Sequence, residues 1–170
     1  REEDKFLIMQ WRNEQMDVLR QNRPLTEADQ ERYYHEVVVP SFSADRPRII
    51  LFSYLRNESC IGYGGLTNID WDSRRAEISF LVNTDRTRDH AVYKEDFAAF
   101  LHLMKQAAFG TLQFNRLFTE TFDIRPHHIR ILEENGFRLE GRMRQHVIIQ
   151  GQPVDSLIHG CLKEYCDVER

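Results

Sequence analysis

The chain has 170 residues, of which 41% are hydrophobic and 29% charged, and its formal net charge is −4. This length and composition are typical of a single globular domain over residues 1–170, with a sizeable core. The mild acidity excludes a general attraction to nucleic acid. No apolar run approaches the roughly 20 residues that a membrane-spanning helix needs, so a membrane protein is excluded as well.

The cysteines and histidines show no metal-site or disulfide pattern. Cys60, Cys161 and Cys166 form no CxxC pair, which favours a reducing, cytoplasmic location. The seven histidines lack ligand spacing, and the adjacent pair at 127–128 would point about 100° apart on a helix. We therefore expect no metal. We recognise no signal peptide, and the start at Arg1 rather than Met suggests a trimmed N-terminus.

The first part of the chain is predicted to be helical. Residues 4–12 combine an apolar face with acidic residues in the first turn. Thr26 is a predicted N-cap, with Asp29 completing a weak capping box, for a helix that runs to Val38. Pro40 is predicted to end that helix, because the residue before a proline avoids the helical region. A polar linker over 41–47 follows.

Strands dominate the middle of the chain. Residues 48–56 are mostly apolar and β-rich, which indicates a buried strand, and residues 60–69 are its hairpin partner. Glycines at 62, 64 and 65 indicate a bulge or a close backbone approach. In the next strand, 75–82, alternation places Glu77 and Ser79 on the face opposite Ala76 and Ile78.

Helices and strands alternate in the second half. Three- and four-residue spacing of apolar residues predicts a helix over 93–109, capped by Gly110. A strand over 117–122 follows, then a helix over 126–134 with proline in its first turn and a cap at 135–136. Two further strands begin at Phe137, with a turn near 150–153. This order indicates an α/β sheet protein.

The order of the pieces between Cys60 and Phe137 resembles the core of the GNAT (GCN5-related N-acetyltransferase) superfamily. The pieces read CIGYGGLTNI, RRAEISFLVN, a helical run ending KQAAF, NRLFTETF and HIRILEENGF. The resemblance extends from about Trp11 to Leu162 and is nearest the ribosomal-protein and pseudaminic-acid pathway aminosugar acetyltransferases. It implies a mixed, mostly antiparallel central sheet flanked by helices. It also implies acetyl transfer from acetyl-CoA, as co-substrate, to a primary amine.

Glu77 is the candidate catalytic residue. A carboxylate in an otherwise apolar strand is costly to bury unless it is paired or used. Several relatives carry a similar Ala-Glu-Ile, and the resemblance implies that Glu77 takes a proton from the attacking ammonium. The alternatives are an ion pair with an arginine such as Arg74 or Arg144, or a position at the rim of the site.

The coenzyme site is expected to depart from the family pattern. The family usually opens its long helix with a glycine-containing loop whose amides hold the pyrophosphate. Residues 83–93 contain no glycine, so charged and hydroxyl side chains are expected to replace the amides. The positions that the resemblance assigns to coenzyme A are the backbones of Phe80, Leu81 and Val82 and the side chains of Arg86, Thr87, Arg88, Arg125 and His128.

The family's usual general acid is also missing. Leu132 stands where many members have a tyrosine that protonates the leaving thiolate. The proton would then come from water or from another residue, of which His128 is one possibility. No cysteine matches a nucleophile position, so we expect direct transfer rather than an acyl-enzyme.

The acceptor is expected to be an amine on a nucleotide-linked sugar. Trp11-Arg12-Asn13 is similar to the same tripeptide in the pseudaminic-acid pathway enzyme, where the first helices wall the acceptor pocket. Tyr63 and Asn68 lie on the hairpin that lines acceptor sites in relatives. A protein N-terminus or a polyamine is the alternative acceptor, core packing is the alternative for Trp11, and a non-catalytic binding protein is the alternative function. Pairing through a late strand would give a homodimer.

Overall fold

The computed structural model describes residues 1–165. Its six-stranded sheet has the order β1-β2-β3-β4-β6-β5, in which β3 and β4 run parallel and all other neighbours antiparallel. The mixed, mostly antiparallel sheet confirms the predicted fold class. The strands are β1 (Ile50–Arg56), β2 (Ser59–Asp70), β3 (Arg75–Val82), β4 (Arg116–Phe122), β5 (Arg138–Ile149) and β6 (Gln152–Leu162).

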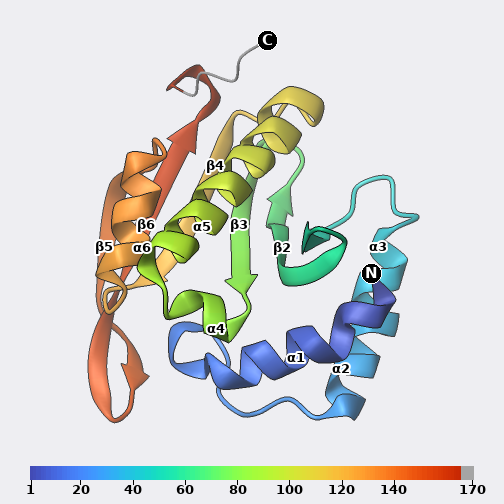
Figure 1. Cartoon of the computed structure of the whole chain (residues 1–170). Helices are drawn as coiled ribbons and strands as arrows, with labels where there is room; N and C mark the ends of the chain where they lie inside the picture. The colour runs from blue at the N-terminus through green and yellow to red at the C-terminus, as the bar shows by residue number, and fades with distance from the viewer. Residues whose placement is uncertain (166–170) are drawn as a thin grey trace.

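Helices flank this sheet (Figure 1). Two of them, α5 and α6, cross one face, where Phe97, Phe100 and Leu101 are buried against the sheet in the main apolar core. Helix α1 lies beside the C-terminal end of β3 and packs against α2. The α-helices are α1 (Lys5–Glu14), α2 (Glu27–Tyr33), α3 (Val39–Ser41), α4 (Thr84–Thr87), α5 (His90–Lys105) and α6 (Pro126–Glu134). The other helical turns are η1 (Glu2–Asp4), η2 (Met16–Val18), η3 (Tyr34–Val38), η4 (Gln106–Thr111) and η5 (Lys163–Tyr165).

The capping prediction is confirmed, but the predicted end of that helix is wrong. Thr26 and Asp29 form a reciprocal capping box at the start of α2. The helical path continues through the π-helical turn η3 and past Pro40 to the end of α3. In a π-helical turn the backbone hydrogen bonds no longer follow the regular α-helical pattern. Pro40, which has no N–H to donate, therefore removes few hydrogen bonds at this point.

Two further predictions are wrong in detail. The first strand, β1, is an edge strand that pairs only with β2, and Phe52 is 42% exposed. An apolar run cannot distinguish an edge strand from a central one, because the missing neighbour is a property of the sheet. Gly110 is not a cap, since η4 continues to Thr111 and Gln113 takes the positive φ of 57°.

The glycines of β2 allow a close backbone approach, as the sequence predicted. A Cβ at Gly64 would collide with the carbonyl oxygen of Ser79 and the ring of Phe100. A Cβ at Gly62 would meet the carbonyl oxygen of Leu81. β2 and β3 therefore lie in closer contact than larger residues would permit.

The sheet opens between β3 and β4. These strands pair only through Arg75–Arg116, Ala76–Leu117 and Glu77–Phe118, whereas β4 pairs with β6 along its whole length. Beyond Glu77 the two parallel strands diverge, and their facing backbone groups no longer pair with one another. We call this opening the splay, and it positions the site described below.

Within residues 1–165 no helix combines the length and apolar character needed to cross a membrane. The same residues contain no group of three or more His, Cys, Asp or Glu that could hold a metal ion. Cys60 is half-buried and Cys161 is buried, while Cys166 lies outside the described residues.

Candidate active site

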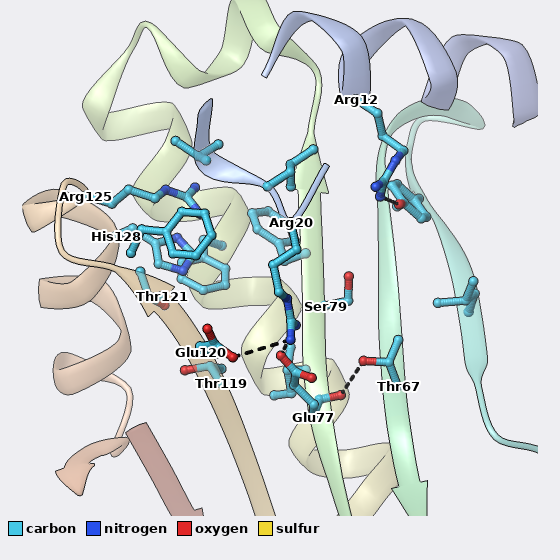
Figure 2. Close-up of a pocket in the computed structure, with 18 of the residues that line it drawn as sticks. Arg12, Arg20, Thr67, Glu77, Ser79, Thr119, Glu120, Thr121, Arg125 and His128 are labelled. Atoms are coloured by element: carbon cyan, nitrogen blue, oxygen red, sulfur yellow. Dashed lines mark hydrogen bonds and ion pairs between the residues drawn. The ribbon is translucent and has the colours of Figure 1, made fainter. Parts of the chain in front are cut away.

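Two cavities meet at the splay. The first, of about 230 Å³, lies between β3 and β4 and is closed on one side by the segment after η2 (Figure 2). The second, of about 470 Å³, lies at the C-terminal end of β3 among α1, α4 and the first turns of α5 and α6. Val18, Arg125 and His128 line both cavities, so they mark the junction.

Glu77 lies in the first cavity and is 2% exposed. Its Oε2 accepts a hydrogen bond of 2.6 Å from the Asn68 side chain, and its Oε1 accepts one from Arg20. The alternative of an ion pair with an arginine is therefore confirmed, but the partner is Arg20, and the suggested partners Arg74 and Arg144 are wrong. Arg74 lies in the β2–β3 turn with a φ of 50°. Arg20 comes from the segment after η2, 57 residues away, so no local pattern in the sequence points to it.

A second carboxylate faces Glu77 across the splay. Arg20 Nη1 lies 3.4 Å from Oε2 of Glu120 on β4, so its guanidinium bridges the two carboxylates, as Figure 2 shows. Glu120 also accepts 2.8 Å from the Ser156 hydroxyl, and His146 Nε2 lies 3.7 Å from it. Sequence reasoning missed Arg20 and Glu120. The alternation in NRLFTETF indicates on which face of the strand the Glu120 side chain lies. It does not indicate which residue lies opposite that side chain.

The backbone of β3 offers donors toward the splay. Asn83 N donates 2.8 Å to Ile61 O, so the backbone groups of Asn83 face β2. Strand residues alternate in this direction, so Leu81 also turns its backbone toward β2, while Phe80 and Val82 turn theirs toward the splay. The carbonyl of Val82 accepts 2.9 Å from the Gln15 side chain. The Phe80 amide therefore points into the opening.

The two arginines expected at the phosphates lie in different surroundings. Arg86 donates 2.5 and 2.8 Å to the carboxylate of Asp96, which is 3% exposed. This hydrogen bonding raises the pKa of Arg86 and turns its guanidinium inward. Arg88 is exposed and donates 2.8 Å to Asp85. Of the two arginines, therefore, only Arg88 presents its guanidinium at the surface.

Helix α5 begins with an acidic cap. The carboxylate of Asp89 accepts from the amides of Ala91 at 2.9 Å and Val92 at 3.1 Å. The Thr87 hydroxyl donates 2.6 Å to the carbonyl of Thr84. The amides of Ala91 and Val92 are thus satisfied by the chain itself and are not free to hold a pyrophosphate. Binding of the phosphates by side chains stays a prediction.

At the junction, three side chains form a connected polar group. Arg125 Nη2 donates 2.9 Å to the Tyr93 hydroxyl, which lies 2.8 Å from His128 Nδ1. The His128 ring stacks on Phe97 with centroids 4.2 Å apart. Burial raises the pKa of Tyr93. Burial, and then the charge of Arg125, hold the pKa of His128 well below 6.5.

A family model described as an acetyltransferase (GNAT) domain matches residues 1–158. The chain belongs to the GNAT acetyltransferase family. GNAT enzymes transfer an acetyl group from acetyl-CoA, so this protein is an N-acetyltransferase with acetyl-CoA as co-substrate. No curated protein sequence gives a significant match.

Solved structures share the GNAT fold. Spermidine N-acetyltransferase from Vibrio cholerae, in complex with CoA and spermine, superposes with a TM-score of 0.83 at 17% identity, over 97% of this chain and 93% of that one. A point mutant of the same enzyme gives 0.82 at 17% identity, over 100% and 96%. A probable acetyltransferase gives 0.64 at 23% identity, over 78% and 73%.

Of the acceptor residues expected from the GNAT resemblance, some lie at the Glu77 site and others only stabilise the fold. Those at the site are Arg12, Tyr63 and Asn68, and the others are Trp11 and Asn13. Arg12 lines the first cavity and donates 2.5 Å to the hydroxyl of Tyr63, which also lines it. Asn68 holds Glu77, as described above. Trp11 is 3% exposed in the core and does not line this cavity. Asn13 bonds the backbone of Leu25 at 2.7 and 2.9 Å, so it fixes the loop that follows α1.

Proposed function

We propose that the protein acetylates a cationic amine of the polyamine class by direct transfer from acetyl-CoA. The observation that carries this proposal is the pair of carboxylates, Glu77 and Glu120, that faces one cation across the splay. A nucleotide-linked amino sugar, the acceptor favoured by the sequence, brings phosphates that two carboxylates would repel. An acceptor with several ammonium groups would instead be attracted.

Arg20 shows what kind of group the carboxylates accept. Its guanidinium reaches between them from a segment without regular structure, and its side chain is 54% exposed. A substrate ammonium would compete for the same oxygens, so Arg20 has to move aside as the acceptor enters. Arg20 is already partly in water, so it can withdraw as the substrate ammonium takes its place. Both carboxylates thus stay paired with a cation during the exchange.

The catalytic step follows from the positions of Glu77 and Phe80. Glu77 takes the proton of the bound ammonium, and the neutral amine attacks the thioester carbon. The Phe80 amide polarises the thioester carbonyl as negative charge develops on its oxygen. Among the described residues 1–165, no cysteine lines the first cavity, which supports direct transfer without an acyl-enzyme.

The second cavity is the proposed coenzyme site. Thr84, Thr87 and His127 line it, and Arg125 marks its boundary with the first cavity. Arg88 supplies an exposed cation nearby for the phosphates. Arg86 is left out of this proposal, since Asp96 already occupies its guanidinium. A spermidine N-acetyltransferase of the same fold was solved in complex with CoA and spermine, which supports a coenzyme and a polyamine as the two ligands.

A thiol-release assay with matched amines tests the acceptor class. Spermidine should give a kcat/KM at least 10-fold above that of a monoamine of similar length and above that of an amino sugar nucleotide. Glu120→Gln should raise the KM for spermidine about 10-fold, which is about 1.4 kcal/mol, and change that for the monoamine less than twofold. Glu27→Gln, at an exposed residue of α2, is the matched control.

Two outcomes would overturn the proposal. One is a preference for the amino sugar nucleotide; the other is a Glu120→Gln enzyme that discriminates between the amines as well as the wild type. Calorimetric titration with acetyl-CoA separates the catalytic from the binding-only alternative. Binding without thiol release over the whole amine panel would show a binding protein, and no binding at millimolar ligand would refute both.

A further inference from the structure

The contacts of Tyr93 determine the protonation of His128. Arg125 is a permanent cation that can only donate, so the hydrogen bond of 2.9 Å makes the Tyr93 oxygen an acceptor. The hydroxyl proton must then point to His128 Nδ1, 2.8 Å away. Nδ1 accepts, and His128, with a pKa well below 6.5, is neutral and carries its proton on Nε2.

The Nε2–H group is not used by the protein itself. Among residues 1–165 no side chain or backbone group forms a hydrogen bond with His128 Nε2, in contrast to Nδ1. The ring lines both the coenzyme cavity and the acceptor cavity. The sulfur of a thioester must lie where these two cavities join, because the acyl carbon lies in the acceptor cavity and the rest of the donor in the other. Figure 2 places Arg125 and His128 together above the Glu77–Glu120 pair.

We propose that Arg125, Tyr93 and His128 form a proton relay that protonates the leaving thiolate, in place of the tyrosine that Leu132 replaces. His128 is the catalytic acid, since it meets the sulfur. Tyr93 and Arg125 act through it and are positioning residues. The relay concerns the donor half of the reaction, so it rests on acetyl transfer but not on the identity of the acceptor amine.

The proton movements balance. The amine nitrogen forms a bond to the acyl carbon and loses its surplus proton to water, the carbon–sulfur bond breaks, and its electron pair stays on sulfur. His128 Nε2 gives its proton to that sulfur while Nδ1 takes the hydroxyl proton of Tyr93. The Tyr93 oxygen is left negative beside the Arg125 guanidinium and regains a proton from solvent after the product leaves.

The coupling to Tyr93 is chemically necessary. A neutral imidazole that gave up its Nε2 proton alone would become an anion, which is too unstable to form at neutral pH. Simultaneous proton transfer to Nδ1 avoids that state. The adjacent Arg125 stabilises the phenolate that results, even though burial by itself raises the pKa of Tyr93.

Two variants test the relay against one matched control. Tyr93→Phe keeps the ring that packs on Phe80 and Phe97 but removes the hydroxyl. Tyr54→Phe removes a hydroxyl that donates 3.2 Å to the backbone of Asp96, outside the relay. His128→Gln removes the imidazole. We expect Tyr93→Phe and His128→Gln to lower kcat about 100-fold with less than a threefold change in the KM for acetyl-CoA. Tyr54→Phe should stay within threefold of the wild type in both.

The leaving group gives the decisive comparison. An aryl thioester of acetate, whose thiol is far more acidic than that of coenzyme A, departs without a proton. With this donor the deficit of both variants should shrink to less than fivefold, which a merely structural role would not produce. An equal deficit with both donors, or a Tyr93→Phe enzyme with normal kcat, would overturn the relay. Absence of thiol release by the wild type would instead remove the transferase function itself.

A readout independent of turnover comes from NMR of the protein without ligands. The ¹⁵N shifts of His128 should show a neutral ring protonated at Nε2, and Tyr93→Phe should add population of the Nδ1–H form. A wild-type ring protonated at Nδ1 would contradict the direction of the relay.

Discussion

Removal of the Arg86 guanidinium should destabilise the fold rather than only weaken coenzyme binding. In Arg86→Met the carboxylate of Asp96, 3% exposed, loses two hydrogen bonds of 2.5 and 2.8 Å. A buried charge left without its partner costs about 3–5 kcal/mol. Arg56 lies 3.9 Å from the same carboxylate, and Arg86 is itself 22% exposed, so we take the lower end, about 3 kcal/mol. For a chain of this length, that corresponds to a fall in Tm of about 6–12 °C.

Urea and thermal unfolding without ligand measure this effect, with Arg88→Met as the matched control. Arg88 is exposed and pairs only with exposed Asp85, so its loss should change stability by less than about 0.5 kcal/mol. The double variant Arg86→Met/Asp96→Asn should recover part of the lost stability, since neither charge is then unpaired. Equal stability of Arg86→Met and Arg88→Met would refute the reasoning.

Three other changes have defined outcomes. Glu77→Gln should lower kcat by two to four orders of magnitude with unchanged far-UV circular dichroism, and a near-normal rate at neutral pH would remove Glu77 as the base. Gly64→Ala should cost about 2–3 kcal/mol in urea unfolding, because its methyl group meets the Ser79 carbonyl, whereas Gly141→Ala, with open space around it, should change stability by less than about 1 kcal/mol. Burial lowers the folded-state pKa of His128, so the unfolded chain binds the proton first as the pH falls: stability is full above about pH 6.5 and declines below it. The stability difference between wild type and His128→Gln should change by up to about 1.4 kcal/mol per pH unit below 6.5, and a pH-independent difference would contradict the burial of a neutral His128.

Local patterns were sufficient for most of the helices and strands. The capping box at Thr26, the proline at the start of α6 and the glycine turn at its end depend on contacts within a few residues, which a sequence displays directly. The two faces of the strand that carries Glu77 were predicted correctly, with Ala76, Ile78 and Val82 together in the main core, because alternation along a strand fixes which side chains share a face. Burial of β1 was predicted wrongly, because it depends on which strands lie beside it.

The site was predictable only in part for the same reason. Glu77 was predicted because it is a carboxylate among apolar residues. Phe80 was predicted from the family resemblance. Arg20 could not be found, since its role depends on a contact 57 residues away from a segment with no regular structure. Tyr93 was named only as the first residue of the predicted helix and the last of the segment without glycine. Its hydroxyl gained significance when the fold brought α5 and α6 together and placed Arg125 on it.

The sequence by itself determined the family, the order of helices and strands, the position of Glu77 and the absence of glycine from the segment before α5. These are properties of neighbouring residues, for which chain connectivity fixes the geometry. Only the tertiary structure decided that Arg86 pairs with Asp96 and that Glu77 faces Glu120 across the splay. Each of these contacts joins a charged side chain to a partner brought close by packing, and its strength depends on burial, which no single residue encodes.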